Sequence, residues 1–130
     1  MNPISKSVLG VAVIALAATA LIHFIEAPAA FGEISYKGML FVANGVGAIV
    51  ALIGILRGAR WGWILGLVIT GGAILGYVAS RTIGLPGLPA EPDAWLEPLG
   101  AASLIVEGLF VILFFATSRT RREPSPASHR

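Results

Sequence analysis

The sequence contains no cysteine, and only 12% of its residues are charged. Without cysteine there can be no disulfide, no thiolate metal site and no cysteine nucleophile. A soluble domain carries about a quarter charged residues, so the low fraction argues against a soluble enzyme and against a nucleic-acid-binding module. What is present instead is 56% hydrophobic residues, with 16 glycines in a chain of 130. This composition is typical of an integral membrane protein.

The apolar residues are gathered into four segments that are almost free of charge. Each is about as long as a helix must be to cross roughly 30 Å of hydrocarbon. Because backbone amides in a bilayer must be satisfied within the protein, the segments are predicted to be helices. The predicted fold is all-α, a polytopic bundle of four transmembrane helices within residues 1–116, with spans at about 8–25, 39–56, 61–79 and 99–116.

The charged residues predict the orientation of these spans. Seven of the nine basic residues lie before the first span, between the second and third, and after the fourth, whereas the other two connections are acidic. Basic residues stay on the cytoplasmic side, so we expect a multi-pass protein of the plasma membrane with both termini in the cytoplasm. Residues 117–130 are expected to form a disordered basic cytoplasmic tail. Trp61, Trp63 and Trp95 are expected at the membrane borders.

The first span has an alternative interpretation. Lys6, the apolar run and Ala18-Thr19-Ala20 resemble a secretory signal with its cleavage site. The apolar run nevertheless continues to Ile25 and carries polar residues like those of the other spans. An uncleaved span is therefore preferred.

Each span has one helical face of small and polar residues. Small residues let helices approach closely in lipid, and polar groups find partners across the interface. Gly62-x-x-x-Gly66 and Gly72-x-x-x-Gly76 are examples on somewhat different faces. We expect these faces to pack into a tight bundle, with a remaining glycine face available for a homodimer or a larger membrane complex. The expected partners are the lipid bilayer and other membrane helices, and not nucleic acid.

Glu107 is an ionisable residue near the middle of the fourth span. Such residues are costly in a bilayer and are usually paired or functional. Thr19, Asn44 and Thr70 are predicted at comparable depth, so that the four form one buried polar layer. Two interpretations stay open. Either Glu107 is protonated and donates a hydrogen bond to Asn44 or to a backbone carbonyl, or it receives a proton or cation from the outer side.

A second polar group is predicted above this layer. His23 and Glu26 are three residues apart and share a helix face, and Glu97 opens the fourth span. Nitrogen and oxygen ligands without sulfur suit zinc, iron, manganese or copper(II), so these three are the candidate metal ligands.

An outer vestibule is also expected. The residues predicted to line it are Glu33, Tyr36 and Arg81. Arg81 is alternatively an interfacial ion-pair partner of Glu97 or Glu26. The sequence has no phosphate-binding loop, no serine in a nucleophile elbow and no histidine pair for a haem, so no cofactor is expected.

Several motifs resemble those of one group of proteins. They are Ile22-His23, Ala27-Pro28 with Phe31 and Glu33, Gly38-x-Leu40-Phe41, Ser80-Arg81-Thr82-Ile83-Gly84-Leu85-Pro86 and Glu97-Pro98-Leu99-Gly100. Together they resemble a family of small, uncharacterised four-span integral membrane proteins typical of actinobacteria. The resemblance implies the four-span architecture and no reaction. Where that family often has proline-glutamate-histidine-phenylalanine, this chain has Pro28-Ala29-Ala30-Phe31, so a second imidazole for a metal is missing.

Three functions are compatible with the sequence. The preferred one is a non-enzymatic accessory or interaction subunit, because the loops are short and no catalytic set is present. The alternative is a small ion- or proton-coupled transporter, or a metal-binding membrane protein, that uses Glu107 as its buried carboxylate. The third is a membrane enzyme or redox protein with a metal, quinone or lipid substrate, in which Tyr36 and Arg81 position a headgroup. Whether the protein is an enzyme stays open, with a non-enzymatic role favoured.

Overall fold

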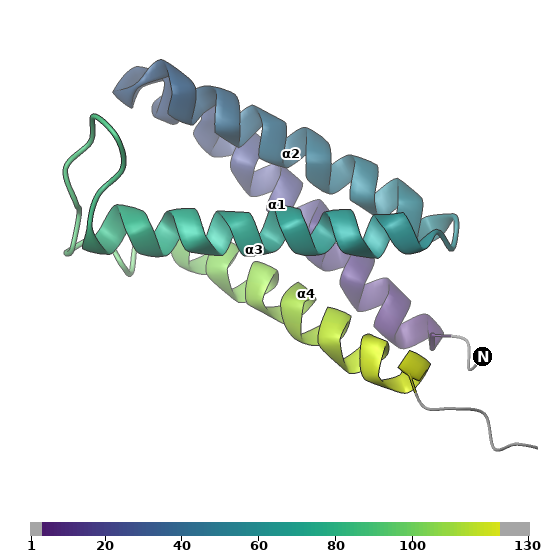
Figure 1. The fold of residues 1–130 in the computed structure, drawn as a ribbon. Coiled ribbons are helices and arrows are strands. Elements are labelled where there is room, and N and C mark those ends of the chain that lie inside the picture. Colours follow the sequence, from purple (N-terminus) through teal and green to yellow (C-terminus); the bar gives the residue numbers. More distant parts are fainter. Residues whose placement is uncertain (1–3, 123–130) are drawn as a thin grey trace, which may run out of the picture.

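The computed structural model describes residues 4–122, with side chains up to residue 118. Its four helices are α1 (Lys6–Glu33), α2 (Ser35–Leu56), α3 (Arg60–Thr82) and α4 (Pro98–Arg122). All four are long and apolar enough to cross a membrane. The chain is thus a membrane protein, and the predicted all-α bundle of four helices is confirmed (Figure 1).

The helices form a ring in which each contacts two neighbours. α1 packs against α2 and α4, and α3 packs against the same two helices. In Figure 1 the start of α1, the α2–α3 turn and the end of α4 gather at one end of the bundle, which we call the terminal end. The α1–α2 junction and the connection formed by residues 83–97 lie at the opposite end, the loop end.

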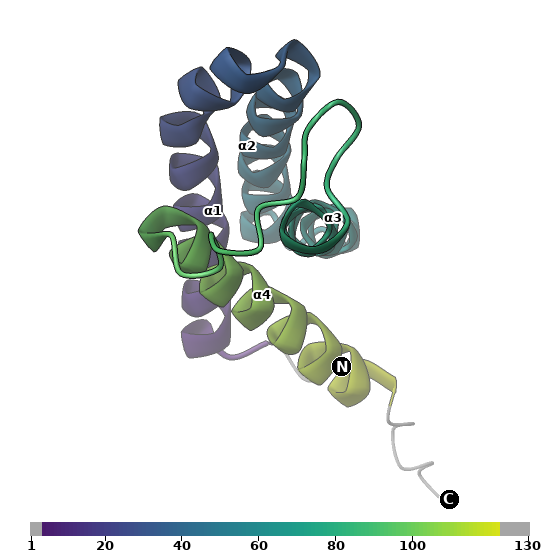
Figure 2. The same ribbon diagram turned by 90° about the vertical axis from the view of Figure 1, so that its left-hand side faces the viewer.

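α1 is longer than its predicted span, which ended at residue 25. The helix continues to Glu33, and only Ile34, in an extended conformation, separates it from α2. The connection predicted between residues 25 and 39 is therefore mostly helical, and the predicted span ends are wrong here. Alanines around Pro28 favour a helix, and the proline removes only one N–H donor from it. Figure 2 shows the end of α1 turning across the loop end toward α2.

The turn between α2 and α3 holds these helices close together at the terminal end. Gly58 has a positive φ of 70°, and the N–H of Ala59 donates to the Gly54 carbonyl over 2.9 Å, which ends α2. A Cβ placed on Gly62 would lie 2.5 Å from the backbone nitrogen of Ile55. The backbones of α2 and α3 can approach this far only because Gly62 has no side chain.

α4 begins and ends differently from the predicted span at 99–116. At its start the Glu97 carboxylate accepts the N–H of Gly100 over 2.8 Å and caps the helix, with Pro98 in the first turn. At its end the helix continues to Arg122, so disorder was wrongly predicted for residues 117–122. These residues include no proline or glycine, and the next helix breaker is Pro124. The rest of the predicted tail, residues 123–130, lies outside the described residues.

The apolar core lies toward the terminal end. Its buried members are Ala12, Ala15, Leu16, Ala51, Ile55, Trp63 and Phe110. The rings of Trp63 and Phe110 stack with their centroids 5.6 Å apart. Trp63, in the first turn of α3, is only 4% exposed, so its ring packs inside the bundle. We call this part of the bundle the packed half.

Candidate binding cavity

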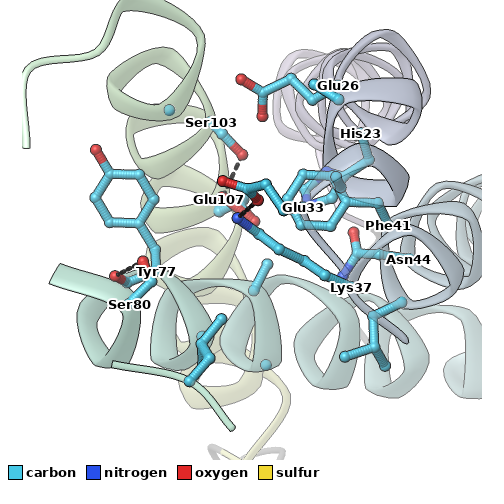
Figure 3. Close-up of a pocket in the computed structure, with 18 of the residues that line it drawn as sticks. His23, Glu26, Glu33, Lys37, Phe41, Asn44, Tyr77, Ser80, Ser103 and Glu107 are labelled. Atoms are coloured by element: carbon cyan, nitrogen blue, oxygen red, sulfur yellow. Dashed lines mark hydrogen bonds and ion pairs between the residues drawn. The ribbon is translucent and has the colours of Figure 1, made fainter. Parts of the chain in front are cut away.

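The other half of the bundle, toward the loop end, surrounds a cavity of about 620 Å³ (Figure 3). All four helices and the connection 83–97 contribute to its walls, and we call this part the cavity half. The acidic, basic and histidine side chains in the wall are His23, Glu26, Glu33, Lys37, Arg81, Glu91, Glu97 and Glu107. Glycine, alanine and aromatic residues make up much of the remaining wall. The cavity is of the size that binds small molecules in other proteins, roughly 300–1,000 Å³.

Glu107 contributes the deepest acidic group. Its side chain is 2% exposed, and it lies nine residues after the first residue of α4, roughly 13 Å along the helix. The Ser103 hydroxyl, one turn earlier, donates to Glu107 Oε1 over 2.5 Å. The other carboxyl oxygen, Oε2, is buried and has no hydrogen-bond partner within residues 4–118. Oε1 of this carboxyl group is therefore held by Ser103, and Oε2 is available to a proton or a ligand.

Asn44 of α2 also keeps an oxygen without a partner. Its Nδ2 donates to the Ile69 carbonyl of α3 over 3.1 Å, whereas Oδ1 is buried and unpaired among the described residues. In Figure 3 Glu107 and Asn44 reach the cavity from α4 and α2. The structure records no hydrogen bond between Glu107 and Asn44 among residues 4–118, and the protonated state of Glu107 stays a prediction.

The other two members of the predicted polar layer are placed differently. Thr19 and Thr70 are both 0% exposed, and neither lines the cavity. Each hydroxyl donates back along its own helix, Thr19 to the Ala15 carbonyl over 2.9 Å and Thr70 to the Gly66 carbonyl over 2.8 Å. Of the four residues predicted to form one layer, the structure brings only Asn44 and Glu107 to a common space.

His23 lines the cavity from α1 and is 7% exposed. Its Nδ1 lies 2.8 Å from the Thr19 carbonyl, and because a carbonyl only accepts, Nδ1 carries the hydrogen. In the neutral ring Nε2 is then an acceptor. The ring also packs against Phe41 of α2, with centroids 5.2 Å apart. His23 thus joins α1 to α2 and presents an acceptor nitrogen in addition to the carboxyl groups.

The three candidate metal ligands do not form a metal site. No group of three histidine, aspartate or glutamate side chains that could hold an ion occurs in the part of the chain that the structure describes. The Glu97 carboxylate caps α4, and Glu26 is near enough to interact with it electrostatically. Helix spacing correctly placed His23 and Glu26 on one face of α1, but no third ligand completes a site.

Glu33, Tyr36 and Arg81, the predicted vestibule, all line the cavity. Glu33 forms an ion pair with Lys37, one turn later across the α1–α2 junction. Arg81 has no ion pair with a carboxylate among residues 4–118, so the predicted pair with Glu97 or Glu26 is wrong. Its guanidinium donates instead to the Ala94 carbonyl, through Nε over 3.3 Å and Nη2 over 3.2 Å. The guanidinium also lies over the Tyr77 ring, 4.0 Å from its centroid.

The connection 83–97 runs across the loop end of the bundle (Figure 2). Tyr36 of α2 donates its hydroxyl to the Pro86 carbonyl over 2.6 Å, and Tyr77 of α3 donates to the Trp95 carbonyl over 2.7 Å. Tyr36 and Arg81, the residues assigned to a substrate headgroup in the enzyme hypothesis, are therefore used to hold this connection. Their engagement weakens that hypothesis.

The cavity is acidic. Five carboxyl groups line it against two cationic side chains, Lys37 and Arg81. Lys37 is held by Glu33 and the Phe41 ring, and Arg81 is held by Ala94 and the Tyr77 ring. Neither cation pairs with Glu107. The deepest carboxyl group therefore has no positive partner among the described residues.

Several lining residues were missed by sequence reasoning. Lys37, Phe41, Tyr77 and Glu91 all line the cavity. The spacing of Lys37 four residues after Glu33 gave a usable signal for an ion pair. Nothing local marks Phe41 or Glu91, because their positions depend on how α2 and the connection 83–97 lie against the other helices.

Comparisons with protein-family models, with curated proteins and with solved structures find no match for this chain, so the resemblance to the actinobacterial four-span family stays a prediction.

Proposed function

We propose that the cavity binds a cation in exchange for a proton on Glu107, and that the protein is a small ion- or proton-coupled membrane transporter. The observation that carries this proposal is the buried Oε2 of Glu107, which has no partner among the described residues and lies in an acidic cavity. The accessory role, the homodimer and the larger complex stay predictions.

The exchange follows from the cost of charge in the bundle. An ionised carboxylate without a partner is costly in a surrounding of low dielectric constant. A proton on Glu107 removes this cost, and so does a cation beside it. Since one carboxyl group is neutralised by either, the proton and the cation compete. Ser103 fixes one oxygen, so the competition takes place at Oε2.

The remaining carboxyl groups make the cavity favourable for a cation. Glu33 and Glu91 lie at the loop end, and Glu26 is near enough to Glu107 to interact with it electrostatically. Clefts lined by one sign of charge raise the local concentration of the opposite ion. The acidic cavity thus favours a cation over an anion as the competitor of the proton on Glu107.

The location that fits this role is the plasma membrane, with the terminal end of the bundle in the cytoplasm. Arg57 and Arg60 flank the α2–α3 turn, and basic residues at span ends are retained on the cytoplasmic side. The loop end then faces the outside, and the packed half lies between the cavity and the cytoplasm.

Dicyclohexylcarbodiimide tests this proposal, because it reacts with protonated carboxyl groups in apolar surroundings and not with carboxylates. We expect mass spectrometry of the protein in liposomes to find the adduct on Glu107. Sodium, potassium or tetraphenylphosphonium, added separately, should suppress the reaction if it binds, and a pH dye should report about one proton released per bound cation, the stoichiometry of a single carboxyl group.

The matched variants are Glu107→Gln and Glu33→Gln. Glu107→Gln should lose both the adduct and the proton release. Glu33→Gln removes a carboxyl group at the mouth that is already paired with Lys37, so the adduct on Glu107 should persist. Proton release that survives in Glu107→Gln, or an adduct that no cation suppresses, would contradict the proposal.

A further inference from the structure

We infer that the cation is a lipophilic organic cation that reaches Glu107 from the membrane, through an opening between α2 and α3. The inference rests on the proposed function and names the class of ligand and the side from which it comes.

The dimensions and chemistry of the cavity favour an organic ligand over an inorganic ion. A volume of about 620 Å³ is far larger than a metal ion needs, and no metal-holding cluster occurs among the described residues. Small-molecule sites have mostly apolar walls with a few well-placed polar groups. Here the walls include Phe41 and Tyr77, and the buried acceptors that lack a partner among residues 4–118 are Glu107 Oε2 and Asn44 Oδ1.

Aromatic rings beside carboxyl groups recognise organic cations in particular. The faces of such rings attract positive charge, and the attraction grows when water is excluded. Two cations of the protein itself already contact these rings. Arg81 lies over the Tyr77 ring, and Lys37 lies 5.7 Å from the centroid of the Phe41 ring. A ligand with both a positive charge and an apolar body would satisfy the deep carboxyl group and the apolar wall together.

The opening lies between the start of α2 and the end of α3. These helices contact each other at Asn44 and Ile69. From there toward the loop end, Gly72 and Gly76 line the cavity on α3, and a Cβ on either would meet nothing within 4 Å. Leu40 of α2 and Val68 of α3 both line the cavity and are 60% and 63% exposed.

This side of the cavity therefore faces the hydrocarbon. The end of the bundle is crossed instead by the connection 83–97, which Tyr36 and Tyr77 hold in place. A lipophilic cation is enriched in the bilayer, where the side opening is available to it. A small hydrated ion lacks this route and must pass the connection.

The test uses equilibrium binding to the full chain in phosphatidylcholine nanodiscs. The probe is tetraphenylphosphonium, compared with tetramethylammonium, with sodium and with the neutral molecule triphenylphosphine oxide. We expect tetraphenylphosphonium to bind about tenfold or more tightly than each of the others. It should also be the cation that suppresses the carbodiimide adduct on Glu107.

Two neighbouring glycines give a matched pair of variants. Gly72→Leu places an apolar side chain in the opening, whereas Gly71→Leu adds the same side chain at a position that does not line the cavity. A Cβ meets nothing within 4 Å at either residue, so both variants should fold. We expect Gly72→Leu to weaken tetraphenylphosphonium binding about tenfold and Gly71→Leu to leave it unchanged.

The outcomes separate this inference from the proposed function. Suppression of the adduct by sodium or tetramethylammonium, but not by tetraphenylphosphonium, would keep the proton exchange and overturn the lipophilic class of the cation. Equal binding of triphenylphosphine oxide would overturn recognition of charge. Equal effects of Gly71→Leu and Gly72→Leu would overturn the side opening. Failure of every cation to suppress the adduct would overturn both proposals.

Discussion

The two halves of the bundle use the same residue type, glycine, with opposite results. In the packed half a Cβ on Gly62 would lie 2.5 Å from a backbone atom of α2, and one on Gly66 would lie 2.5 Å from the Phe110 ring. In the cavity half, Gly72 and Gly76 have no atom within 4 Å of that position. A glycine repeat at helical spacing therefore permits a close helix contact without requiring one.

Polar side chains differ between the halves in the same way. Thr19 and Thr70, next to the packed half, satisfy their hydroxyl groups within their own helices. Asn44 and Glu107, which line the cavity, each keep one buried oxygen without a partner in the described residues. Unsatisfied buried acceptors cost stability, so their concentration at one cavity supports the binding role proposed for it. The comparison separates residues that stabilise the bundle from residues that are proposed to bind a ligand.

The largest expected effect is in the packed half. Phe110→Ala removes a 0% exposed ring that stacks on Trp63, and we expect the free energy of unfolding to fall by about 4 kcal/mol. Phe115→Ala is the control, because Phe115 is on the same helix and 55% exposed. Unfolding in mixed micelles of increasing detergent strength measures both. Equal losses would break the distinction between a packed and a membrane-facing side of α4.

A smaller difference is expected between two glycines of α3. Gly62→Ala forces apart α2 and α3 where their backbones meet, at a cost of about 2–3 kcal/mol. Gly72→Ala adds a methyl group at an open position of a helix, which should leave stability unchanged or raise it by up to about 1 kcal/mol. The same unfolding measurement compares them. A large loss in Gly72→Ala would mean that the cavity half is also closely packed at this position.

The smallest expected effect is an increase in the free energy of unfolding. Glu107→Met replaces a buried carboxyl group with an apolar side chain of similar size, and we expect a gain of about 1–2 kcal/mol in the free energy of unfolding. The carbodiimide adduct should be lost in the same variant. Glu107→Gln, which keeps a polar group, is the control and should show no such gain. Destabilisation by Glu107→Met would assign Glu107 to the structure of the bundle instead.

The architecture could be predicted from the sequence because it depends on local properties. Length and absence of charge specify a membrane helix without knowledge of its neighbours, and the four segments were found on that basis. The helix ends were harder. The first predicted span ends at residue 25, where the apolar run ends, but the helix continues through Pro28 because a proline that costs one hydrogen bond can be accommodated near the border of a membrane span.

The cavity depends on distances between helices, which the sequence does not contain. The depth of Asn44 and Glu107 could be estimated from residue counts, since a helix rises by a fixed amount per residue. Their shared cavity, and the absence of Thr19 and Thr70 from it, depend on which faces of the helices meet. Trp63 shows the same limit, because its sequence position suits a membrane border and its burial results from contact with Phe110 of a distant helix.

The way the connection 83–97 is tethered has a consequence for its evolution. Tyr36, Tyr77 and Arg81 bind it through the carbonyls of Pro86, Trp95 and Ala94. A carbonyl is present whatever the side chain, so replacing residues other than Gly84 and Gly87, which have a positive φ, leaves these three acceptors in place. Inserting or deleting a residue instead changes the spacing of the acceptors and misplaces them together. Apart from Gly84 and Gly87, whose φ angles are positive, the connection is thus less constrained in composition than in length.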